Sequence, residues 1–224
     1  MTDSPRVVAI DGPSGAGKGT VARTVATELG FRYVDTGAMY RAVAWKARRD
    51  GLSLTDAEAV AALARRAVID LDHGVVIDGD DVSQAIRTPE IDAAAAVVAQ
   101  HPGVRAALVE RQRRYRSGAG VVMEGRDIGT VVFPAADVKL FLDALPEERA
   151  RRRAIDPAHA ASRDARDVEG VAQALEARDR SDRTRAASPL TMAPDAVYID
   201  TTGLTVDQVV AKALAIVNQA LAKT

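Results

Sequence analysis

The strongest structural signal in the chain is the segment from Val7 to Thr20, which reads VVAIDGPSGAGKGT. An apolar run ends in a glycine-rich turn, and the turn leads through Lys18 into a stretch that favours helix. The backbone N–H groups of such a turn point inward, and together with the helix N-terminus they can cradle phosphate groups. The order of strand, glycine-rich turn and helix therefore predicts a phosphate-binding loop in an α/β fold.

The loop departs from the usual pattern at one position. In most such loops the lysine is followed by Ser or Thr, whose hydroxyl contacts a nucleotide-bound Mg²⁺. Here Gly19 follows Lys18, and the hydroxyl comes one position later at Thr20. The alternatives are a glycine-rich turn with an incidental lysine, a damaged loop, or a loop built for a different partner. The strand-turn-helix context argues against the first.

Short apolar runs recur along the chain and alternate with longer helical stretches. Five of them are expected to be strands of a mostly parallel, buried sheet; they cover residues 6–11, 31–35, 120–125, 138–143 and 196–200. Helices are expected near residues 18–29, 38–50, 102–116, 147–155, 168–183 and 205–222. The predicted fold is a three-layer α/β/α arrangement with a central parallel sheet of about five strands.

Two zones do not fit this alternation. The distance between the second and third strands is too long for one crossover, so residues 60–100 are expected to form an insertion on the core. Within it, GVVIDGDDVS at 74–83 is expected to form a hairpin that turns at DGDD. The charged stretch 153–167 is expected to be a mobile surface segment. The whole chain, 1–224, is interpreted as one domain with a core of 1–60 and 100–224.

Composition limits the classes of function. The chain has 224 residues and a formal net charge of −1, so no global charge favours nucleic acid or an anionic membrane. Cysteine is absent, which excludes disulfides, thiolate metal sites and cysteine nucleophiles. The N-terminal MTDSPR does not have the pattern of a signal peptide, and no run is apolar enough to span a bilayer. We expect a cytoplasmic protein.

A second anion site is expected at DTGAMYR, residues 35–41. Thr36 opens a helix directly after a strand, and Tyr40 and Arg41 lie one turn in. Alone, this stretch would more simply be an N-capped helix with a surface arginine.

Two later stretches carry further charged side chains. In MEGRDIGTVVF (123–133), Glu124 ends a strand, where ligands bind in open α/β sheets, and Arg126 and Asp127 follow. In EARDRSDRTR (176–185), Arg178, Asp182 and Arg185 share one helix face. A surface turn and a solvated helix are the simpler alternatives. The Arg-rich EERARRR (147–153) could likewise supply a catalytic arginine or be a solvated face.

Taken together, these strings resemble the bacterial cytidylate kinase family, one of the nucleoside monophosphate kinases among the P-loop proteins. The matching segments, in chain order, are AIDGPSGAGKGT, DTGAMYRA, DVSQAIRT, HPGVRAALVERQR, EGRDIGTVVFP, KLFLDA and RDRSDRTRAASPL. They cover essentially the whole chain. The form GxxGxGKGT is the one that nucleoside monophosphate kinases use, and there Mg²⁺ is held mainly by nucleotide phosphates and water.

The resemblance implies transfer of the γ-phosphoryl group of ATP to CMP or dCMP, with Mg²⁺ as cofactor, a monomer, an enlarged monophosphate-binding region at about 60–100 and a short lid at about 150–167. The residues that match the family's ATP loop are Gly12, Pro13, Ser14, Gly15, Ala16, Gly17, Lys18, Gly19 and Thr20. No protein ligand for the metal is implied. The charge-stabilising catalytic residues would be Lys18, Arg126 and Arg185.

The same resemblance assigns the CMP site. Arg41, Arg126 and Arg185 match the arginines that hold the phosphate of the monophosphate. Arg178 and Asp182 match the pair that binds the sugar, and Arg105 and Asp127 match groups at the cytosine. Asp35, Thr36 and Tyr40 complete the expected set. Ala96 stands where some members have a serine that touches the base, so the tolerance for UMP stays open.

Three other classes compete with this interpretation. A P-loop GTPase would carry Asn-Lys-x-Asp, but the single asparagine, Asn218, is followed by Gln219. A kinase of a small metabolite, such as shikimate or a nucleoside, would share the loop without GRDxGTVVF. A non-catalytic nucleotide sensor would not need Lys18 and the full set of arginines.

Overall fold

The main element is a parallel sheet of five strands. The computed structural model describes residues 5–155 and 168–222. The strands are β1 (Arg6–Asp11), β2 (Arg32–Asp35), β6 (Gly120–Gly125), β7 (Val138–Asp143) and β8 (Val197–Asp200), and their order in the sheet is β2-β6-β1-β7-β8. All neighbouring pairs are parallel. The predicted fold class and all five predicted strands are confirmed, with ends that shift by at most one residue.

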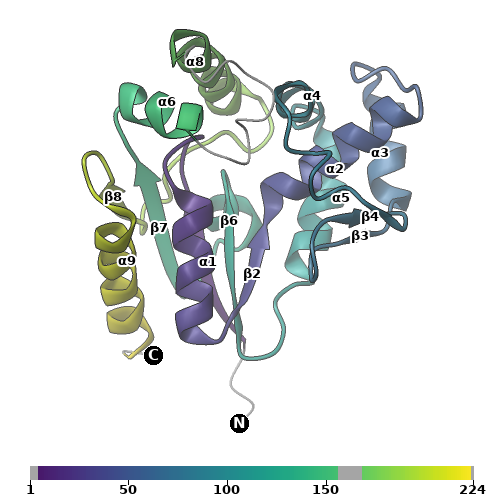
Figure 1. Cartoon of the computed structure of the whole chain (residues 1–224). Coiled ribbons are helices and arrows are strands. Elements are labelled where there is room, and N and C mark those ends of the chain that lie inside the picture. The colour runs from purple at the N-terminus through teal and green to yellow at the C-terminus, as the bar shows by residue number, and fades with distance from the viewer. Residues whose placement is uncertain (1–4, 156–167, 223–224) are drawn as a thin grey trace.

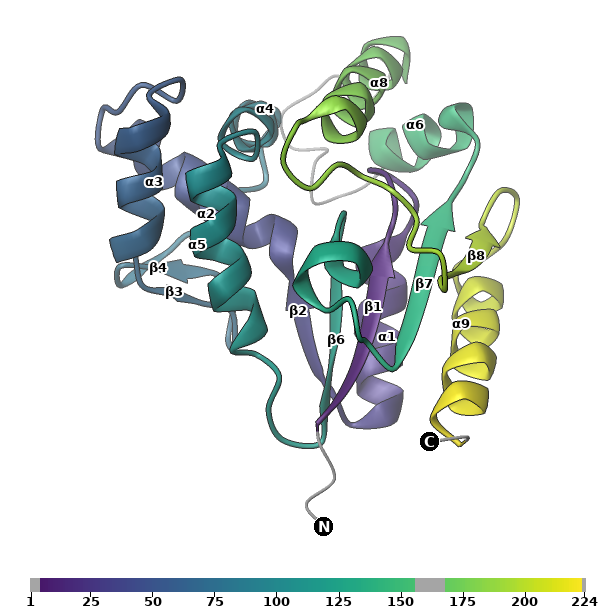
Figure 2. The same cartoon turned by 180° about the vertical axis from the view of Figure 1, so that it is seen from behind.

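Helices cover both faces of this sheet (Figures 1 and 2). α1 (Lys18–Leu29) and α9 (Val206–Leu221) lie on one face. The alternation within β1 separates the two cores: Val8 and Ile10 pack with α1 and α9, whereas Val7 and Ala9 belong to the apolar cluster on the other face. α9 begins with a capping box between Thr205 and Gln208.

The strand order creates a crevice at the carboxyl end of β1. The chain leaves β1 toward β2 on one side of the sheet, returns as β6 between them, and then crosses β1 to form β7 on its other side. Connections that leave in opposite directions open a space between neighbouring loops, where α/β proteins bind their ligands. The glycine-rich turn 12–17 lies at this point.

The segment between α2 (Thr36–Arg49) and β6 forms a region outside the main sheet. It contains α3 (Ala57–Arg66), α4 (Pro89–Val98), α5 (Pro102–Arg113) and a small antiparallel sheet of β3 (Ile69–Asp70), β4 (Val76–Ile77) and β5 (Asp80–Asp81). The expected hairpin is confirmed as β4 and β5. Asp78 and Gly79, with φ of 51° and 88°, form the two-residue turn between them.

The predictions missed α3 and α4, although each has a clear start signal. The side chain of Asp56 accepts a hydrogen bond from Ala59 N and caps α3. Thr88 caps α4 in the same way, and Pro89 occupies its first position. Both helices are short and rich in alanine. The apolar periodicity of α4 is weak, whereas α3 has a well-defined apolar face that was an available signal.

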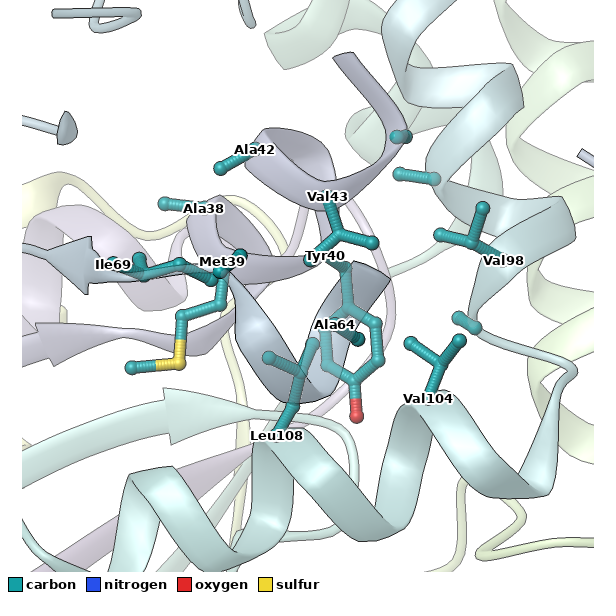
Figure 3. Packing of buried hydrophobic residues seen from close by; sticks show 14 of the residues in the cluster. Ala38, Met39, Tyr40, Ala42, Val43, Ala64, Ile69, Val98, Val104 and Leu108 are labelled. Atoms are coloured by element: carbon teal, nitrogen blue, oxygen red, sulfur yellow. The ribbon is translucent and has the colours of Figure 1, made fainter. Parts of the chain in front are cut away.

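This outer region is held to the sheet by continuous apolar packing (Figure 3). Met39, Tyr40 and Val43 of α2 face Leu108 and other side chains of α5 and α3, and the same cluster includes side chains of β1, β2 and β6. At about 25 cal/mol per Å² of buried apolar surface, such a cluster is a dominant source of stability. It fixes α2 and α5, and therefore the polar side chains that they direct toward the crevice.

Two helices lie above the carboxyl ends of β1 and β7, namely α6 (Pro146–Ile155) and α8 (Val168–Thr184). Ala150 of α6 packs against Val171 and Leu175 of α8. The expected lid at about 150–167, and the expected mobile segment at 153–167, fall largely on residues 156–167, which lie outside the described residues. Among the described helices, none is long and apolar enough to cross a membrane.

Candidate active site

The glycine-rich turn adopts a geometry that only glycine permits. Gly12 has a φ of 145°, and a Cβ there would lie 1.9 Å from the carbonyl oxygen of Leu142 in β7. Gly15 and Gly17 also have positive φ values, 79° and 86°, and Gly17 is the N-cap of α1. The turn is therefore pressed against β7, and its last residues present the N-terminus of α1 to the crevice.

Lys18 points back into this turn. Its side chain is buried, and Nζ donates a hydrogen bond to the carbonyl oxygen of Pro13 at 2.7 Å. Burial lowers the pKa of Lys18 to about 7, the nearby charge of Arg126 adds to the shift, and Glu124 opposes it. An anion bound in the turn would stabilise the protonated form of Lys18 and raise its pKa again.

The space beside Gly19 is filled by Glu124. A Cβ on Gly19 would lie 2.9 Å from Oε1 of Glu124 and 3.6 Å from the hydroxyl of Tyr33, which itself donates to that oxygen at 2.7 Å. Burial raises the pKa of Glu124, and Asp35 adds to this. The carboxylate of Glu124 from β6 thus occupies the space that a side chain at position 19 would need. A glycine after the lysine fits this packing, which argues against a damaged loop.

A second charged group lies at the start of α2. Asp35 caps the helix, since Oδ1 accepts from Ala38 N at 3.1 Å, and Oδ2 pairs with Nη2 of Arg41 at 2.8 Å. The hydroxyl of Thr36 donates to the carbonyl oxygen of Glu124 at 2.7 Å and ties α2 to β6. Arg41 is mostly buried and faces the crevice, which argues against the simpler alternative of a surface arginine.

Asp182 is the centre of the arginine cluster. It accepts from Nε of Arg126 at 3.0 Å and from Nη1 of Arg185 at 3.1 Å. Burial alone would raise the pKa of Asp182, but Arg126, Arg178 and Arg185 together lower it below its usual value. Arg178 lies 3.4 Å from Oδ1 of Asp92 in α4. The carboxylate of Asp182 thus orients two arginines. An anion bound in the cleft could accept hydrogen bonds from the same guanidinium groups.

Arg105 and Asp127 form a buried ion pair at the far end of the crevice. The guanidinium of Arg105 also lies over the ring of Tyr40, 5.4 Å from its centroid. Since the two charged groups and the ring converge from α5, η1 (Ile128–Val132) and α2, this end offers a donor, an acceptor and an aromatic face.

Three buried arginine N–H groups, Nε of Arg41, Nε of Arg105 and Nη2 of Arg185, are left without a hydrogen-bond acceptor among the described residues, as is Nε of Arg111, which does not border the crevice. Burying such donors unpaired is costly, at about 1–3 kcal/mol each. All three side chains border the crevice. They are positioned to donate to an anionic or polar ligand.

These groups line one cleft with a volume of about 1170 Å³. Of the predicted site residues, Ser14 to Thr20 and the whole expected CMP set border it, while Gly12 and Pro13 lie behind its wall. Ala96 also lines the cleft, next to Ala95 and Ala99. The structure thus brings together residues that are up to 171 positions apart, from Ser14 to Arg185.

The cleft has further walls that the sequence interpretation did not assign. Gln84 and Arg87 border it on the side of the outer region, Glu148 and Arg151 to Arg153 on the side of α6, and Leu204, Val206 and Val209 at the start of α9. For the α6 arginines the run EERARRR was a signal, although Arg149 itself is buried behind the turn. For the α9 residues no signal distinguishes them from an ordinary helix start.

Asp11 is a buried functional group that the predictions missed. Its two carboxylate oxygens accept from Ile128 N at 2.8 Å and from Gly129 N at 2.7 Å, so it fixes the turn that carries Arg126 and Asp127. Burial raises the pKa of Asp11 to about 6, although these two hydrogen bonds oppose the shift. Its position at the end of the apolar run RVVAID was the available signal.

Comparisons with known proteins identify the family. The sequence model described as cytidylate kinase matches residues 8–219. The chain is 48% identical over 215 residues to a cytidylate kinase of Desulfitobacterium hafniense strain Y51, covering 94% of this chain and 92% of that protein. It is 50% identical over 218 residues to a cytidylate kinase of Solibacter usitatus strain Ellin6076, covering 95% and 92%.

A solved gluconokinase from Sinorhizobium meliloti 1021 aligns with a TM-score of 0.50 and 16% identity, over 96% of this chain and 93% of that one, which shows a shared fold alone. The cleft contains both the glycine-rich turn and the arginine cluster that characterise the resemblance, and the family match extends over nearly the whole chain. The chain therefore belongs to the cytidylate kinase family.

Proposed function

We propose that this protein transfers the γ-phosphoryl group of ATP to CMP or dCMP and releases ADP with CDP or dCDP. Family membership supports the reaction class. The observation that carries the proposal is the shared cleft, in which the phosphate-binding turn faces the arginine cluster around Asp182. Transfer between two nucleotides needs the donor phosphate and the acceptor phosphate to face each other, and the turn and the arginine cluster provide a site for each. A nucleotide sensor or a switch needs only the turn.

In the proposed donor site, Gly12 to Thr20 wrap the phosphates of ATP. The positive φ values of Gly15 and Gly17 turn the loop so that its N–H groups face inward. Lys18 exchanges the carbonyl oxygen of Pro13 for a phosphate oxygen and becomes fully protonated as it does so. It then neutralises charge on the group being transferred.

In the proposed acceptor site, Arg41, Arg126 and Arg185 hold the phosphate of CMP. Each is already oriented by a carboxylate, Asp35 for the first and Asp182 for the other two. The N–H groups of Arg41 and Arg185 that are unpaired among the described residues supply additional donors. The arginines are therefore preorganised, and little rearrangement is needed when the monophosphate arrives.

The rest of CMP extends from this cluster toward α5. Arg178 and Asp182 are proposed to bind the sugar, and the pair Arg105 and Asp127 the edge of the cytosine. Tyr40, held beneath Arg105, offers a face for the base. Asp35 and Thr36 complete the wall between the two sites. Since Ala96 presents only a methyl group here, base recognition depends on Arg105 and Asp127.

The chemistry needs alignment and charge stabilisation more than a base. The attacking group is a phosphate oxygen that is already largely ionised at neutral pH, so no histidine is required. Lys18, Arg126 and Arg185 are proposed to stabilise the charge that spreads over the equatorial oxygens in the transition state. We also propose that the outer region closes over the substrates, because water would otherwise accept the phosphoryl group.

Mg²⁺ is proposed as the cofactor. Within the described residues there is no cluster of three or more His, Asp or Glu that could hold a metal ion. The site nevertheless fits a hydrated ion held mainly by phosphates, because the carboxylate of Glu124 lies against Gly19 at the edge of the turn, where it can bind water ligands. When bound, the ion would neutralise charge shared by the β- and γ-phosphates.

The remaining features of the proposal come from the sequence. The division into a core of 1–60 and 100–224, an inserted CMP-binding region of about 60–100 and a lid of about 150–167 stays a prediction. So do the cytoplasmic location and the monomeric state, the second of which the family resemblance implies. Binding partners other than the nucleotides are not expected.

An ADP-release assay with Mg-ATP tests the proposal. The acceptors are CMP, dCMP, UMP, AMP, GMP and shikimate, each at the same concentration. Turnover with CMP and dCMP and little turnover with the purine monophosphates is expected. Comparable turnover with UMP would mean that Ala96 relaxes base selection. Absence of turnover with every monophosphate would contradict the proposed function, and turnover with shikimate alone would assign the fold to a metabolite kinase.

A further inference from the structure

α8 borders the cleft with one face only. Arg178 and Asp182 project from that face toward the proposed acceptor site, and Arg185 follows directly after Thr184, the last residue of the helix. Asp179 is one residue further along than Arg178, so it points about 100° away around the helix. It is only 2% exposed, and no acceptor role has been assigned to it.

Asp179 instead contacts the phosphate-binding turn. Its Oδ1 accepts from the backbone N of Ser14 at 3.4 Å, and its Oδ2 accepts from Nη1 of Arg149. The same Nη1 donates to the carbonyl oxygen of Ser14 at 3.1 Å. The N–H and the C=O of one residue of the turn are thus both held by a buried ion pair whose members come from α8 and α6.

Arg149 is fixed in its turn by the loop before α6. Its Nε donates to the carbonyl oxygen of Ala144 at 3.0 Å, and the side chain is 6% exposed. A Cβ on Gly15 would lie 2.9 Å from the carbonyl oxygen of Arg149, so the backbone of α6 also touches the turn directly. Neither partner of the ion pair can shift without moving Ser14 or Gly15.

We propose that Asp179, through Arg149 and Ser14, is a positioning residue that makes the binding of the nucleoside triphosphate and of the monophosphate cooperative. This inference rests on the proposed function. Within the part of the chain that the structure describes, α8 carries Arg178 and Asp182 of the proposed acceptor site and also Asp179, which contacts the donor turn. A phosphate that orders Ser14 to Thr20 therefore also fixes α8, and a monophosphate bound by Arg178 and Asp182 prepares the turn.

The charge on Asp179 supports a role beyond packing. A buried ion pair gives little net stability compared with apolar side chains of similar size, so stability alone does not explain it. Asp179 also acts on Arg126: burial would lower the pKa of that guanidinium, and the charges of Asp182 and then Asp179 raise it. The same carboxylate thus influences one group of the acceptor site and holds one residue of the donor site.

Isothermal titration calorimetry can measure the cooperativity. The dissociation constant of CMP is determined with and without a saturating non-hydrolysable ATP analogue, and the ratio of the two values is the coupling factor. The reciprocal experiment, titrating the analogue with and without CMP, must give the same factor by linkage. The wild-type factor is expected to be at least about fivefold, the lower end of typical couplings.

Two variants and a matched control separate coupling from folding. Asp179→Asn keeps the shape but removes the charge, and the double variant Arg149→Met with Asp179→Leu replaces the pair by apolar side chains. The control is Asp137→Asn, because Asp137 also accepts from a backbone N (Val7, 2.7 Å) and an arginine (Arg6, 3.3 Å), but at the end of the sheet opposite the cleft.

Both Asp179 variants are expected to bring the coupling factor to within about twofold of 1, while the affinity for CMP alone changes less than threefold, about 0.7 kcal/mol. The control should keep the wild-type coupling factor.

If the single variant does not fold, the coupling factor of the double variant tests the inference. A wild-type factor of 1, or a double variant with the wild-type factor, would overturn the inference. If the wild type binds neither nucleotide, the proposed function itself is contradicted. If it binds both nucleotides but each without effect on the other, only the inference of cooperative binding is overturned.

Discussion

Lys18 is the residue on which the proposed donor site depends most directly. Its ammonium group lies within the turn, 2.7 Å from the Pro13 carbonyl oxygen, and no other lysine among the described residues borders the cleft. Replacing it with Met keeps the volume but removes the charge. We expect kcat in the ADP-release assay to fall by about 10²–10³, as on removal of one preorganised donor. Circular dichroism should show an unchanged fold, and Lys212→Met on the exposed face of α9 is the control. A near-native rate would remove Lys18 from the proposed mechanism.

The lowered pKa of Lys18 predicts proton uptake on ATP binding. In the free protein the group has a pKa of about 7, so at pH 8 it is mostly neutral. Bound phosphates favour the charged form and raise the pKa, so up to about one proton is taken up per site. The affinity for ATP should accordingly weaken as the pH rises above 7. Calorimetry at pH 8 in buffers of different ionisation enthalpy measures the uptake, and Lys18→Met should abolish it; equal uptake by both proteins would assign the proton to another group.

Replacement of Arg185 tests the proposed acceptor site at the level of a single residue. It contacts Asp182 and Ser188 and has one buried N–H group unpaired among the described residues. Arg185→Ala removes a charge-assisted contact to the monophosphate, which is worth about 1.5–3 kcal/mol. The kcat/KM for CMP should fall by roughly 10–150-fold, with the KM for ATP nearly unchanged. Arg183→Ala, at an exposed position in the last turn of α8, is the control. Unchanged kinetics for CMP would mean that this helix face is merely solvated.

At the scale of elements, Gly12 determines how the turn meets β7. Its φ of 145° is unfavourable for other residues, and an added Cβ would lie 1.9 Å from the Leu142 carbonyl oxygen, which cannot move without breaking the sheet. Gly12→Ala is expected to lower the free energy of unfolding by at least about 1–3 kcal/mol and to weaken ATP binding, because the turn must shift. Denaturant titration and calorimetry measure the two effects.

Gly30→Ala is the matched control for that substitution. Gly30 also has a positive φ, 65°, but nothing lies within 4 Å of an added Cβ. It should cost only about 1 kcal/mol in stability and leave ATP binding unchanged. If both variants behaved alike, backbone strain rather than contact with β7 would be the constraint on the turn.

Elements with strong local signals could be predicted from sequence, and those with weak signals could not. The five sheet strands are apolar runs with clear ends, and α1, α8 and α9 have sustained helical patterns, so their positions were predicted almost to the residue. α4 is short and alanine-rich, which gives a weak apolar face despite the cap at Thr88, whereas α3 has both a cap at Asp56 and a clear apolar face and was predictable. η1 follows from the two hydrogen bonds to Asp11, a tertiary effect that no local pattern contains.

The composition of the candidate site was predicted from motifs, but the partners of its residues were not. The sequence indicated that Arg126, Asp182 and Arg185 act together. It did not indicate that Asp182 binds both arginines, or that Glu124 fills the space left by Gly19. Arg126 and Asp182, like Gly19 and Glu124, are dozens of positions apart in the sequence, so these contacts are decided by packing in three dimensions. The same holds for the pair of Asp179 with Arg149.

At the scale of the whole molecule, the two sides of the cleft are already joined by side-chain contacts, one of which is the hydrogen bond that Gln100 donates to Ser181 of α8 at 3.0 Å. Asp92 of α4 lies 3.4 Å from Arg178 of α8 and also pairs with Arg153 of α6. The outer region and the helices above the sheet are thereby linked by charge before a nucleotide binds. Because Arg178 is proposed to bind the sugar of CMP, substrate binding gives it a second partner and strengthens this closure.

Removing the carboxylate of Asp92 should therefore widen the free cleft. The chain has no cysteine, so Glu58→Cys in α3 and Lys212→Cys in α9 provide two unique, exposed positions for fluorescent labels on opposite sides. We expect Asp92→Asn to lower the energy-transfer efficiency of the free protein, and CMP with the ATP analogue to restore most of the wild-type value, since bound phosphates then hold the arginines. Asp50→Asn, which removes only a pair within α2 and its cap, should leave the efficiency unchanged. Equal efficiencies for the wild type and Asp92→Asn would show that apolar packing alone, rather than this charge, fixes the outer region against the core.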